Sequence, residues 1–183
     1  SLFYFGREVL GYDLEEVPHK ELCDFLQSPG NFKLVILPRG SFKTSVISQI
    51  YPIWRIINDW NSRILLDSET LPNSLNNLSV VKNHLERNVK FRHIFGDLQS
   101  KRWTQDYLVV SERTDLSLRD PTLSVSALEG ILRSGPHYTD IIPDDLHSNE
   151  NTKTRDQVER VYERFRLYFS LLEPGGKMVV VGT

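Results

Sequence analysis

The sequence predicts an α/β fold in which helices cover a mostly parallel central sheet. One observation is a series of short apolar and β-branched runs that suit strands, at residues 34–37, 63–67, 107–111, 123–127, 138–142 and 177–181. The other is that helical patterns separate several of these runs, and such alternation is typical of a parallel sheet. At 183 residues with 39% apolar content, the chain suits a single domain with one core.

Residues 1–30 are predicted to form a helical lead-in to the first strand. Within it, the segment from Pro18 to Gln27 reads as a helix, and Ser28-Pro29-Gly30 ends it. The helix after the first strand has an apolar stripe at three-to-four spacing, formed by Val46, Ile47, Ile50, Trp54 and Ile57. Pro52 is expected to kink this helix or to shift its hydrogen bonding.

After the strand at 63–67, Ser68 and Thr70 are available to cap a helix with apolar residues at Leu71, Leu75, Leu78, Val81 and Leu85. Residues 90–103 are more polar and contain Phe95-Gly96-Asp97, which is predicted to be a connection. Asp120-Pro121 predicts a turn between the strands at 107–111 and 123–127.

A long amphipathic helix is predicted to begin at a capping box of Thr154 and Gln157. Its inward residues are predicted to be Val158, Val161, Tyr162, Phe165, Tyr168, Phe169 and Leu172. An exposed charged face is predicted for Arg155, Arg160, Arg164 and Arg166, interleaved with acids. Pro174-Gly175-Gly176 ends the helix before the last strand.

The bulk composition narrows the class of protein. A formal net charge of −2 carries no global nucleic-acid signature. Cys23 is the only cysteine, so no disulfide framework exists and a reducing interior is expected. No apolar run approaches the roughly 18 residues of a membrane span, and no leader is evident, so a soluble, intracellular chain is expected. The start at Ser1 and the end directly after a strand predict a fragment of a longer protein.

The first chemical candidate is the stretch Pro38-Arg39-Gly40-Ser41-Phe42-Lys43-Thr44-Ser45, between the first strand and its helix. A loop of this kind can cradle a polyphosphate with backbone N–H groups, with Lys43 on the β- and γ-phosphates and Thr44 on Mg²⁺. The general pattern G-x-x-x-x-G-K-[ST] has glycines where this chain has Leu37 and Phe42. An ordinary strand-to-helix turn with a surface lysine is therefore the alternative.

The second candidate is the acidic pair Asp144 and Asp145 at the end of the strand that begins at residue 138. In a phosphate-loop NTPase, the first acid supports the Mg²⁺ and the second orients and deprotonates the attacking water. The alternative is a solvated Pro-Asp-Asp turn. The pair follows Lys43 by about 100 residues, which suits the additional-strand (ASCE) class of P-loop NTPases. Gly182 and Thr183 follow the last strand, where ligands bind in open α/β sheets. The Thr183 hydroxyl is a candidate sensor of the γ-phosphate, and the alternative is a residue without a role at the site.

With these residues in place, the chain resembles the N-terminal ATPase domain of the large terminase subunit, the DNA-packaging motor of tailed bacteriophages. The family's deviant Walker A motif has the form P-R-G-x-x-K-[ST], which matches residues 38–44. Asp-Asp-Leu at 144–146 resembles its Walker B region. The Gly182-Thr183 pair resembles its coupling motif, which links hydrolysis to movement. The resemblance covers nearly the whole chain.

The resemblance implies ATP hydrolysis with Mg²⁺, which drives double-stranded DNA into a procapsid. It implies that Arg39 contacts the γ-phosphate or couples the loop to neighbouring elements, and that Arg133 is a candidate arginine finger, with a surface arginine as the alternative. Implied partners are double-stranded DNA, the portal protein, the small terminase subunit and further copies in a ring. The implied location is the host cytoplasm, transiently on the procapsid. The family's nuclease domain is not expected within these residues.

Two other functions remain open at this point. One is a helicase or another ATPase of the same broad class. The other is a nucleotide-binding module that does not hydrolyse its ligand, which the missing glycines at positions 37 and 42 suggest. Turnover of ATP, as opposed to binding alone, separates the second alternative from the motor.

Overall fold

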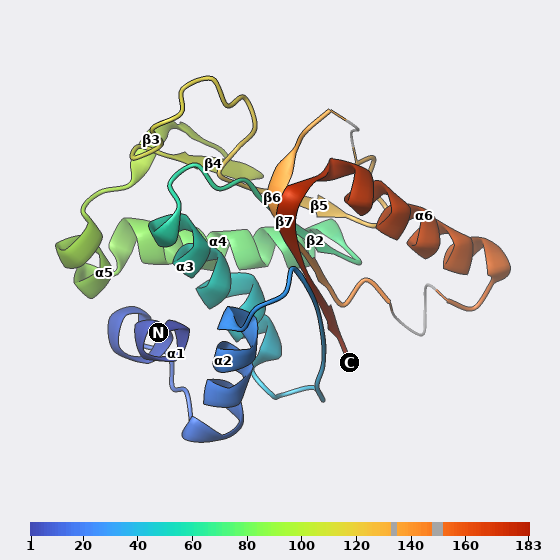
Figure 1. Ribbon diagram of the computed structural model, residues 1–183, viewed down its shortest axis with the longest axis horizontal. Coiled ribbons are helices and arrows are strands. Elements are labelled where there is room, and N and C mark those ends of the chain that lie inside the picture. The colour runs from blue at the N-terminus through green and yellow to red at the C-terminus, as the bar shows by residue number, and fades with distance from the viewer. Residues whose placement is uncertain (133–134, 148–151) are drawn as a thin grey trace.

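A seven-stranded sheet forms the centre of the computed structural model, which describes residues 1–132, 135–147 and 152–183 (Figure 1). The strands are β1 (Phe32–Ile36), β2 (Ile64–Ser68), β3 (Gln99–Trp103), β4 (Tyr107–Val110), β5 (Leu123–Ala127), β6 (Tyr138–Asp144) and β7 (Leu172–Gly182). The helices are α1 (Leu2–Tyr4), α2 (Glu21–Gln27), α3 (Tyr51–Asn58), α4 (Leu71–Arg87), α5 (Val89–Phe95) and α6 (Arg155–Leu171). Shorter π-helical segments are η1 (Phe5–Leu10), η2 (Glu16–Lys20) and η3 (Ser45–Ile50).

The strand order is β1-β7-β6-β2-β5-β4-β3. The first five strands in this order run parallel to one another, whereas β4 pairs antiparallel with β5 and β3 pairs antiparallel with β4. The predicted α/β fold with a mostly parallel sheet is therefore confirmed. The crossovers place β7, the last strand of the sequence, between β1 and β6.

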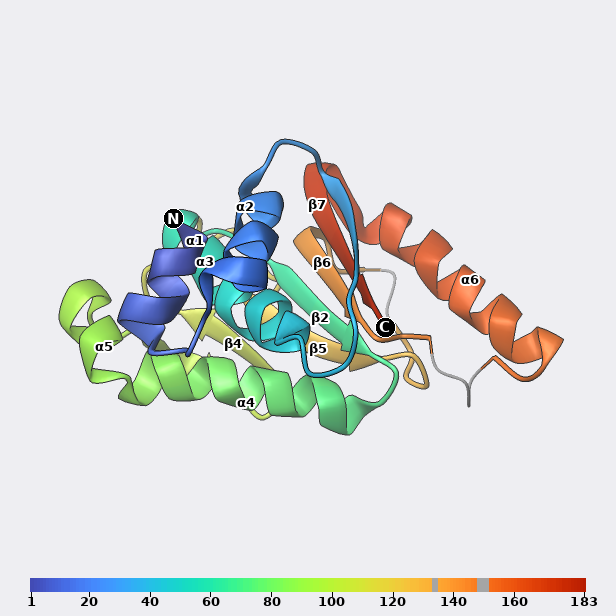
Figure 2. The same cartoon turned by 90° about the horizontal axis from the view of Figure 1, so that it is seen from below.

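The two faces of the sheet bury alternate residues of the same strands. Leu65 and Ile141 belong to a cluster with α6, whereas their neighbours Leu66 and Ile142 belong to the larger cluster on the opposite face. Figure 2 shows α6 on one side of the sheet and the remaining helices on the other. Because side chains alternate along a strand, two-sided cover explains why these strands read as continuous apolar runs.

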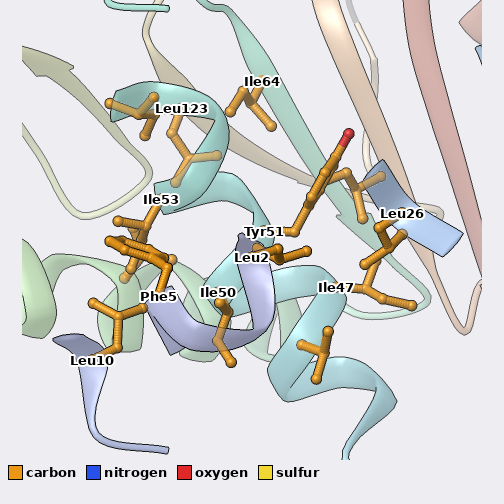
Figure 3. Close-up of a cluster of buried hydrophobic side chains, with 14 of the residues drawn as sticks. Leu2, Phe5, Leu10, Leu26, Ile47, Ile50, Tyr51, Ile53, Ile64 and Leu123 are labelled. Atoms are coloured by element: carbon orange, nitrogen blue, oxygen red, sulfur yellow. The ribbon is translucent and has the colours of Figure 1, made fainter. Parts of the chain in front are cut away.

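The N-terminal lead-in packs into the larger cluster. Leu2, Phe5 and Leu10 are buried beside Ile47 and Ile50, which belong to the helical segment after the first strand (Figure 3). Fully burying a side chain of this size contributes about 1.5–3 kcal/mol. The lead-in therefore helps to hold that helical segment against the sheet.

Several local predictions are confirmed. The segment predicted as a helix between Pro18 and Gln27 forms most of η2 and all of α2. Near Pro52 the hydrogen bonding changes from the π-helical pattern of η3 to the α-helical pattern of α3. Thr154 and Gln157 form the predicted capping box, with the Thr154 hydroxyl accepting from the Gln157 backbone N–H at 3.3 Å. None of the helices in the described parts of the chain is long and apolar enough to cross a membrane.

The predicted connection at Phe95-Gly96-Asp97 joins α5 to β3, two elements of the polar region 90–103 that the sequence analysis did not predict. The side chain of Asn88 caps α5 by accepting from the backbone N–H of Phe91 at 3.0 Å. The strand β3 lies at the edge of the sheet with mostly exposed residues, so it has little of the apolar alternation that predicts a strand.

Three predictions on α6 are wrong. Tyr162 and Phe169 were expected to face inward, but each is 59% exposed. Arg164 was expected on the charged outer face, but its side chain is buried. The reason is a carboxylate on the sheet that draws the arginine inward, because a buried charge needs a partner.

That carboxylate is Asp67, at the end of β2. The Nε of Arg164 donates to Asp67 Oδ2 at 2.7 Å, and the hydroxyl of Tyr168 donates to the same oxygen at 2.5 Å. The Nη2 of Arg164 donates to Ser126 Oγ at 2.6 Å and to the carbonyl of Ala127 at 2.8 Å. Burial and the charge of Asp67 raise the pKa of Tyr168 well above its usual value. The network ties α6 to the carboxyl ends of β2 and β5.

Replacing Arg164 with Met is expected to lower the free energy of unfolding by about 3–5 kcal/mol, because the Asp67 carboxylate loses its cation while remaining buried. The control is Arg160→Met, an exposed arginine on the same helix, which should change stability by less than about 0.5 kcal/mol. Urea unfolding of both variants measures the difference. Equal stabilities would contradict the buried ion pair.

Candidate functional site

Three segments that are distant in sequence meet at the carboxyl edge of the sheet. Strands β1, β7 and β6 are neighbours and parallel, with Ile36 opposite Gly182 and Asp144 opposite Val181. Beyond the strand ends, the backbone N–H of Leu37 donates to the Gly182 carbonyl at 3.3 Å. This register brings the loop at 38–45, the acidic pair and the Gly-Thr pair together.

The loop itself is shaped by two residues with positive φ. Gly40 has φ 81°, and Phe42 has φ 58°, a left-handed conformation that costs a side-chain-bearing residue about 1–2 kcal/mol. The Phe42 carbonyl accepts from the backbone N–H of Val46 at 2.9 Å, which starts the helical segment. The ring of Phe42 lies 5.5 Å from that of His19, between centroids. Phe42 thus takes a backbone conformation that favours glycine.

Lys43 points inward and is 5% exposed. Its ammonium donates to the carbonyl of Leu37 at 3.0 Å and to the hydroxyl of Thr183 at 2.5 Å. It also lies 3.7 Å from Oδ2 of Asp145. The alternative prediction, an exposed surface lysine on an ordinary turn, is therefore wrong for this side chain.

Asp145 faces the lysine from the end of β6. Its carboxylate accepts from the Thr183 hydroxyl, at 2.9 Å to Oδ1 and 3.1 Å to Oδ2. Its backbone has φ 47°, and its N–H donates to the Val181 carbonyl at 3.0 Å. Thr183 thus bridges the ammonium of Lys43 and the carboxylate of Asp145.

Asp144 lies deeper and is 6% exposed. The hydroxyl of Ser48 in η3 donates to its Oδ2 at 2.6 Å. Burial raises the pKa of Asp144 above the usual carboxyl value, the Ser48 hydrogen bond lowers it, and the charge of Asp145 raises it. The Thr44 hydroxyl and Lys43 lower this pKa to a smaller extent. The two adjacent acids therefore sit in different environments.

A cavity of about 320 Å³ opens beside these groups. It is lined by Arg39, Gly40, Ser41, Phe42, Lys43, Thr44, Ser45 and Asp145. The structure thus brings most of the predicted loop residues together with one of the two predicted acids around a single cavity. Pro38 is exposed next to this lining, and the side chain of Arg39 is exposed. Arg133, the candidate arginine finger, lies outside the described residues.

The side chains next to the cavity suit a hard divalent cation. Mg²⁺ prefers oxygen ligands and is usually held by one or two carboxylates together with waters and substrate phosphates. Thr44 and Asp144 supply a hydroxyl and a carboxylate, and Oδ1 of Asp144 is buried without a hydrogen-bond partner among the described residues. The residues present therefore fit a magnesium ion bound together with a phosphate-bearing ligand.

Ser48 is a residue of this site that the sequence analysis missed. It lies about one turn after Thr44, in a stretch whose neighbours Val46, Ile47 and Ile50 are all buried. A single hydroxyl in such an apolar stripe needs a buried partner, which is the signal that could have identified it.

Comparisons with known proteins do not assign the chain to a family. No family model matches the sequence. A search of curated proteins returned no match either.

The conformation of Phe42 can be tested by comparing Phe42→Gly with Phe42→Ala, since both remove the ring and differ only in the β-carbon. The glycine variant should be more stable by about 1 kcal/mol, because alanine retains the strain of a positive φ. At Glu163, an exposed position in α6, the same pair should show the opposite order, since alanine favours helix. Thermal unfolding of the four variants gives both differences. A more stable alanine variant at position 42 would rule out the left-handed conformation.

The raised pKa of Asp144 predicts a pH-dependent stability. The native state holds this proton more tightly than the unfolded state, so the contribution of Asp144 is most favourable at low pH and is lost as pH rises above the usual carboxyl range. Asparagine carries no charge at any of these pH values, so Asp144→Asn avoids the cost of a buried carboxylate. The variant should therefore stabilise the metal-free protein at pH 7 by about 1 kcal/mol, or about 2–4 °C in Tm.

The stabilisation by Asp144→Asn should shrink toward pH 4, which thermal unfolding in EDTA across this range measures. Asp13→Asn, which removes an exposed carboxyl, is the control for the loss of one negative charge. A loss of stability at pH 7 in Asp144→Asn would contradict the raised pKa.

Proposed function

We propose that this chain is an ATPase domain of the large-terminase type, which hydrolyses ATP with Mg²⁺ to drive double-stranded DNA into a viral procapsid. The observation that carries the proposal is the convergence of Lys43, Asp145 and Thr183, from three separate segments, within hydrogen-bonding or ion-pair distance. Each of these residues belongs to a different motif of the sequence.

The topology supports the same proposal. In the additional-strand class of P-loop NTPases, an extra strand separates the strand of the phosphate loop from the strand of the catalytic acids. Here β7 lies between β1, which precedes the loop, and β6, which carries Asp144. The P-loop assignment of this α/β fold rests on that order together with the loop.

Lys43 has the role of phosphate ligand in this proposal. Its ammonium is surrounded by oxygen atoms of Leu37, Thr183 and Asp145. Phosphate oxygens are stronger acceptors than a hydroxyl because they are charged. An entering polyphosphate would therefore compete with Thr183 for the lysine, and backbone N–H groups of the loop would bind the same ligand.

Thr44 and Asp144 would hold Mg²⁺, which when bound neutralises charge that develops on the transferred phosphoryl group. Asp145, next to Asp144 and at the cavity, would orient the attacking water and accept its proton. Thr183, bonded to both Lys43 and Asp145, is placed to pass a change at the phosphate to β7, as a coupling residue would. Arg39, exposed at the cavity, would contact the γ-phosphate.

The wider proposal follows the family that the sequence resembles. The chain would act in a ring of copies on the procapsid in the host cytoplasm, with the portal protein, the small terminase subunit and double-stranded DNA as partners. In such a ring an arginine from a neighbouring copy can complete the active site, with Arg133 as the candidate. Such fingers raise rates by about 10³ to 10⁵, so a slow isolated domain agrees with the proposal.

Two variants test the assignment. Lys43→Met should weaken ATP binding by about 100-fold, because a buried cation that contacts phosphate is lost. Asp145→Asn should bind ATP within a few-fold of the wild type but lower the rate of phosphate release by about 10²- to 10⁴-fold. Asparagine also tolerates the positive φ at this position. Fluorescence of a labelled ATP and release of inorganic phosphate are the measurements, with Lys101→Met, an exposed lysine of β3, as control.

The possible outcomes separate the functions. Binding of Mg-ATP without any phosphate release, even with procapsids and DNA present, would favour a module that does not hydrolyse. Hydrolysis without DNA entry into procapsids would favour another ATPase of the class. Unchanged ATP binding in Lys43→Met would remove the phosphate-loop assignment altogether.

A further inference from the structure

The contact between Ser48 and Asp144 is one of the most enclosed polar contacts at the site. Ser48 is 1% exposed, and its hydroxyl donates to Asp144 Oδ2 at 2.6 Å. The residues lie 96 positions apart in the sequence, on η3 and at the end of β6. Ser48 lies in a stretch whose apolar residues Val46, Ile47 and Ile50 are buried, so the carboxylate is the partner that makes burial of its hydroxyl tolerable.

The second oxygen of the same carboxylate is different. Oδ1 of Asp144 is buried and accepts no hydrogen bond from the residues that the structure describes. A buried carboxylate oxygen without a donor is unusual and calls for an ion or water as its partner. Thr44, which precedes Ser48 by about one turn, lies close enough for its hydroxyl to lower the pKa of Asp144. The open oxygen therefore belongs to the proposed Mg²⁺ site.

A second polar contact holds the helical segment η3–α3 against β6, nearer the other end of the segment. Arg55 of α3 forms a two-bond ion pair with Asp140 of β6, Nε to Oδ1 at 2.7 Å and Nη2 to Oδ2 at 3.1 Å. Both contacts therefore join the same helical segment to the same strand. A shift of this helical segment along β6 would disturb both contacts.

We propose that Ser48 is a positioning residue for the metal: it holds Oδ2 of Asp144 so that Oδ1 faces the cation bound with the nucleotide. This inference rests on the proposed function, because it assumes a divalent cation between Asp144 and a phosphate. Residues that orient a metal ligand in this way typically change metal affinity by about 10- to 100-fold when they are removed.

Ser48→Ala tests the proposal through the metal dependence of nucleotide binding, with a fluorescent ATP analogue titrated with Mg²⁺. The Mg²⁺ concentration for half-maximal binding should rise about 10- to 100-fold. Binding of the analogue in EDTA should not change, because the Ser48 hydroxyl donates its hydrogen bond to Asp144 and the variant leaves the loop itself unaltered. Ser48→Thr, which keeps the hydroxyl, should restore the wild-type Mg²⁺ dependence.

The matched control is Ser74→Ala. Ser74 is also fully buried, and its hydroxyl also makes one hydrogen bond of 2.6 Å, but to the carbonyl of Ser126. Both alanine variants lose a buried serine bond, so a general loss of packing affects both. Only Ser48→Ala should shift the Mg²⁺ titration.

A double variant shows whether Ser48 acts through Asp144. In an Asp144→Asn background, Ser48→Ala should cause no further shift, since the oriented carboxylate is already absent. Should Ser48→Ala fail to fold, Ser48→Cys keeps the shape with a weaker donor and should still raise the Mg²⁺ requirement by several-fold.

The outcomes distinguish this inference from the proposed function. Wild-type protein that binds the analogue with the expected Mg²⁺ dependence, together with a Ser48→Ala titration equal to that of Ser74→Ala, overturns the role of Ser48 alone. Wild-type protein that binds no ATP, or binds it without regard to Mg²⁺, overturns the proposed function and this inference with it. Equal shifts by Ser48→Ala in both backgrounds would place its effect outside Asp144.

Discussion

The candidate site depends on two polar contacts that hold the helical segment η3–α3 against strand β6. One is the ion pair of Arg55 with Asp140, and the other is the hydrogen bond of Ser48 to Asp144. Asp140 and Asp144 lie on one strand and are almost fully buried, so neither contact is weakened by solvent as a surface pair would be. Apolar packing alone permits small shifts of a helix over a sheet, whereas these directional contacts set one position. That position also places Lys43, which lies directly before the helical segment.

The two adjacent acids of the site differ in how deeply they are buried. Asp144 is buried and its pKa is raised, whereas the neighbouring Asp145 is partly exposed and lies 3.7 Å from the ammonium of Lys43. Adjacent residues on an extended strand point to opposite sides, but the positive φ of Asp145 breaks this alternation at the strand end. Pairs of carboxyl groups with different environments are the usual basis for dividing roles between two acids. The proposed division of roles, with the metal at Asp144 and the attacking water at Asp145, therefore has a physical basis in the fold.

The features predicted from the sequence are those that local patterns determine. The strands of the parallel sheet, the capping box of Thr154 and the loop before Lys43 all depend on residues within a few positions of one another. The inward turn of Arg164 could not be predicted, because charge pattern favours solvent and the deciding partner, Asp67, lies 97 residues away. The partner of Ser48 also lies far away, at Asp144, 96 residues further on, although the position of Ser48 among buried apolar residues was a signal. The edge strand β3 was missed because it has no buried face to produce an apolar alternation.

Phe42 shows why a motif and the geometry behind it need separate treatment. A glycine before the lysine of a phosphate loop is favoured because it adopts positive φ without cost. Phe42 adopts φ 58° despite its side chain, and its ring is placed against His19. Local strain of this size persists only where surrounding contacts determine the conformation, and it occurs most often at functional sites. The missing glycine therefore does not argue against a phosphate loop. At this position the positive φ depends on the contact of the Phe42 ring with His19, in the N-terminal lead-in, instead of on a glycine.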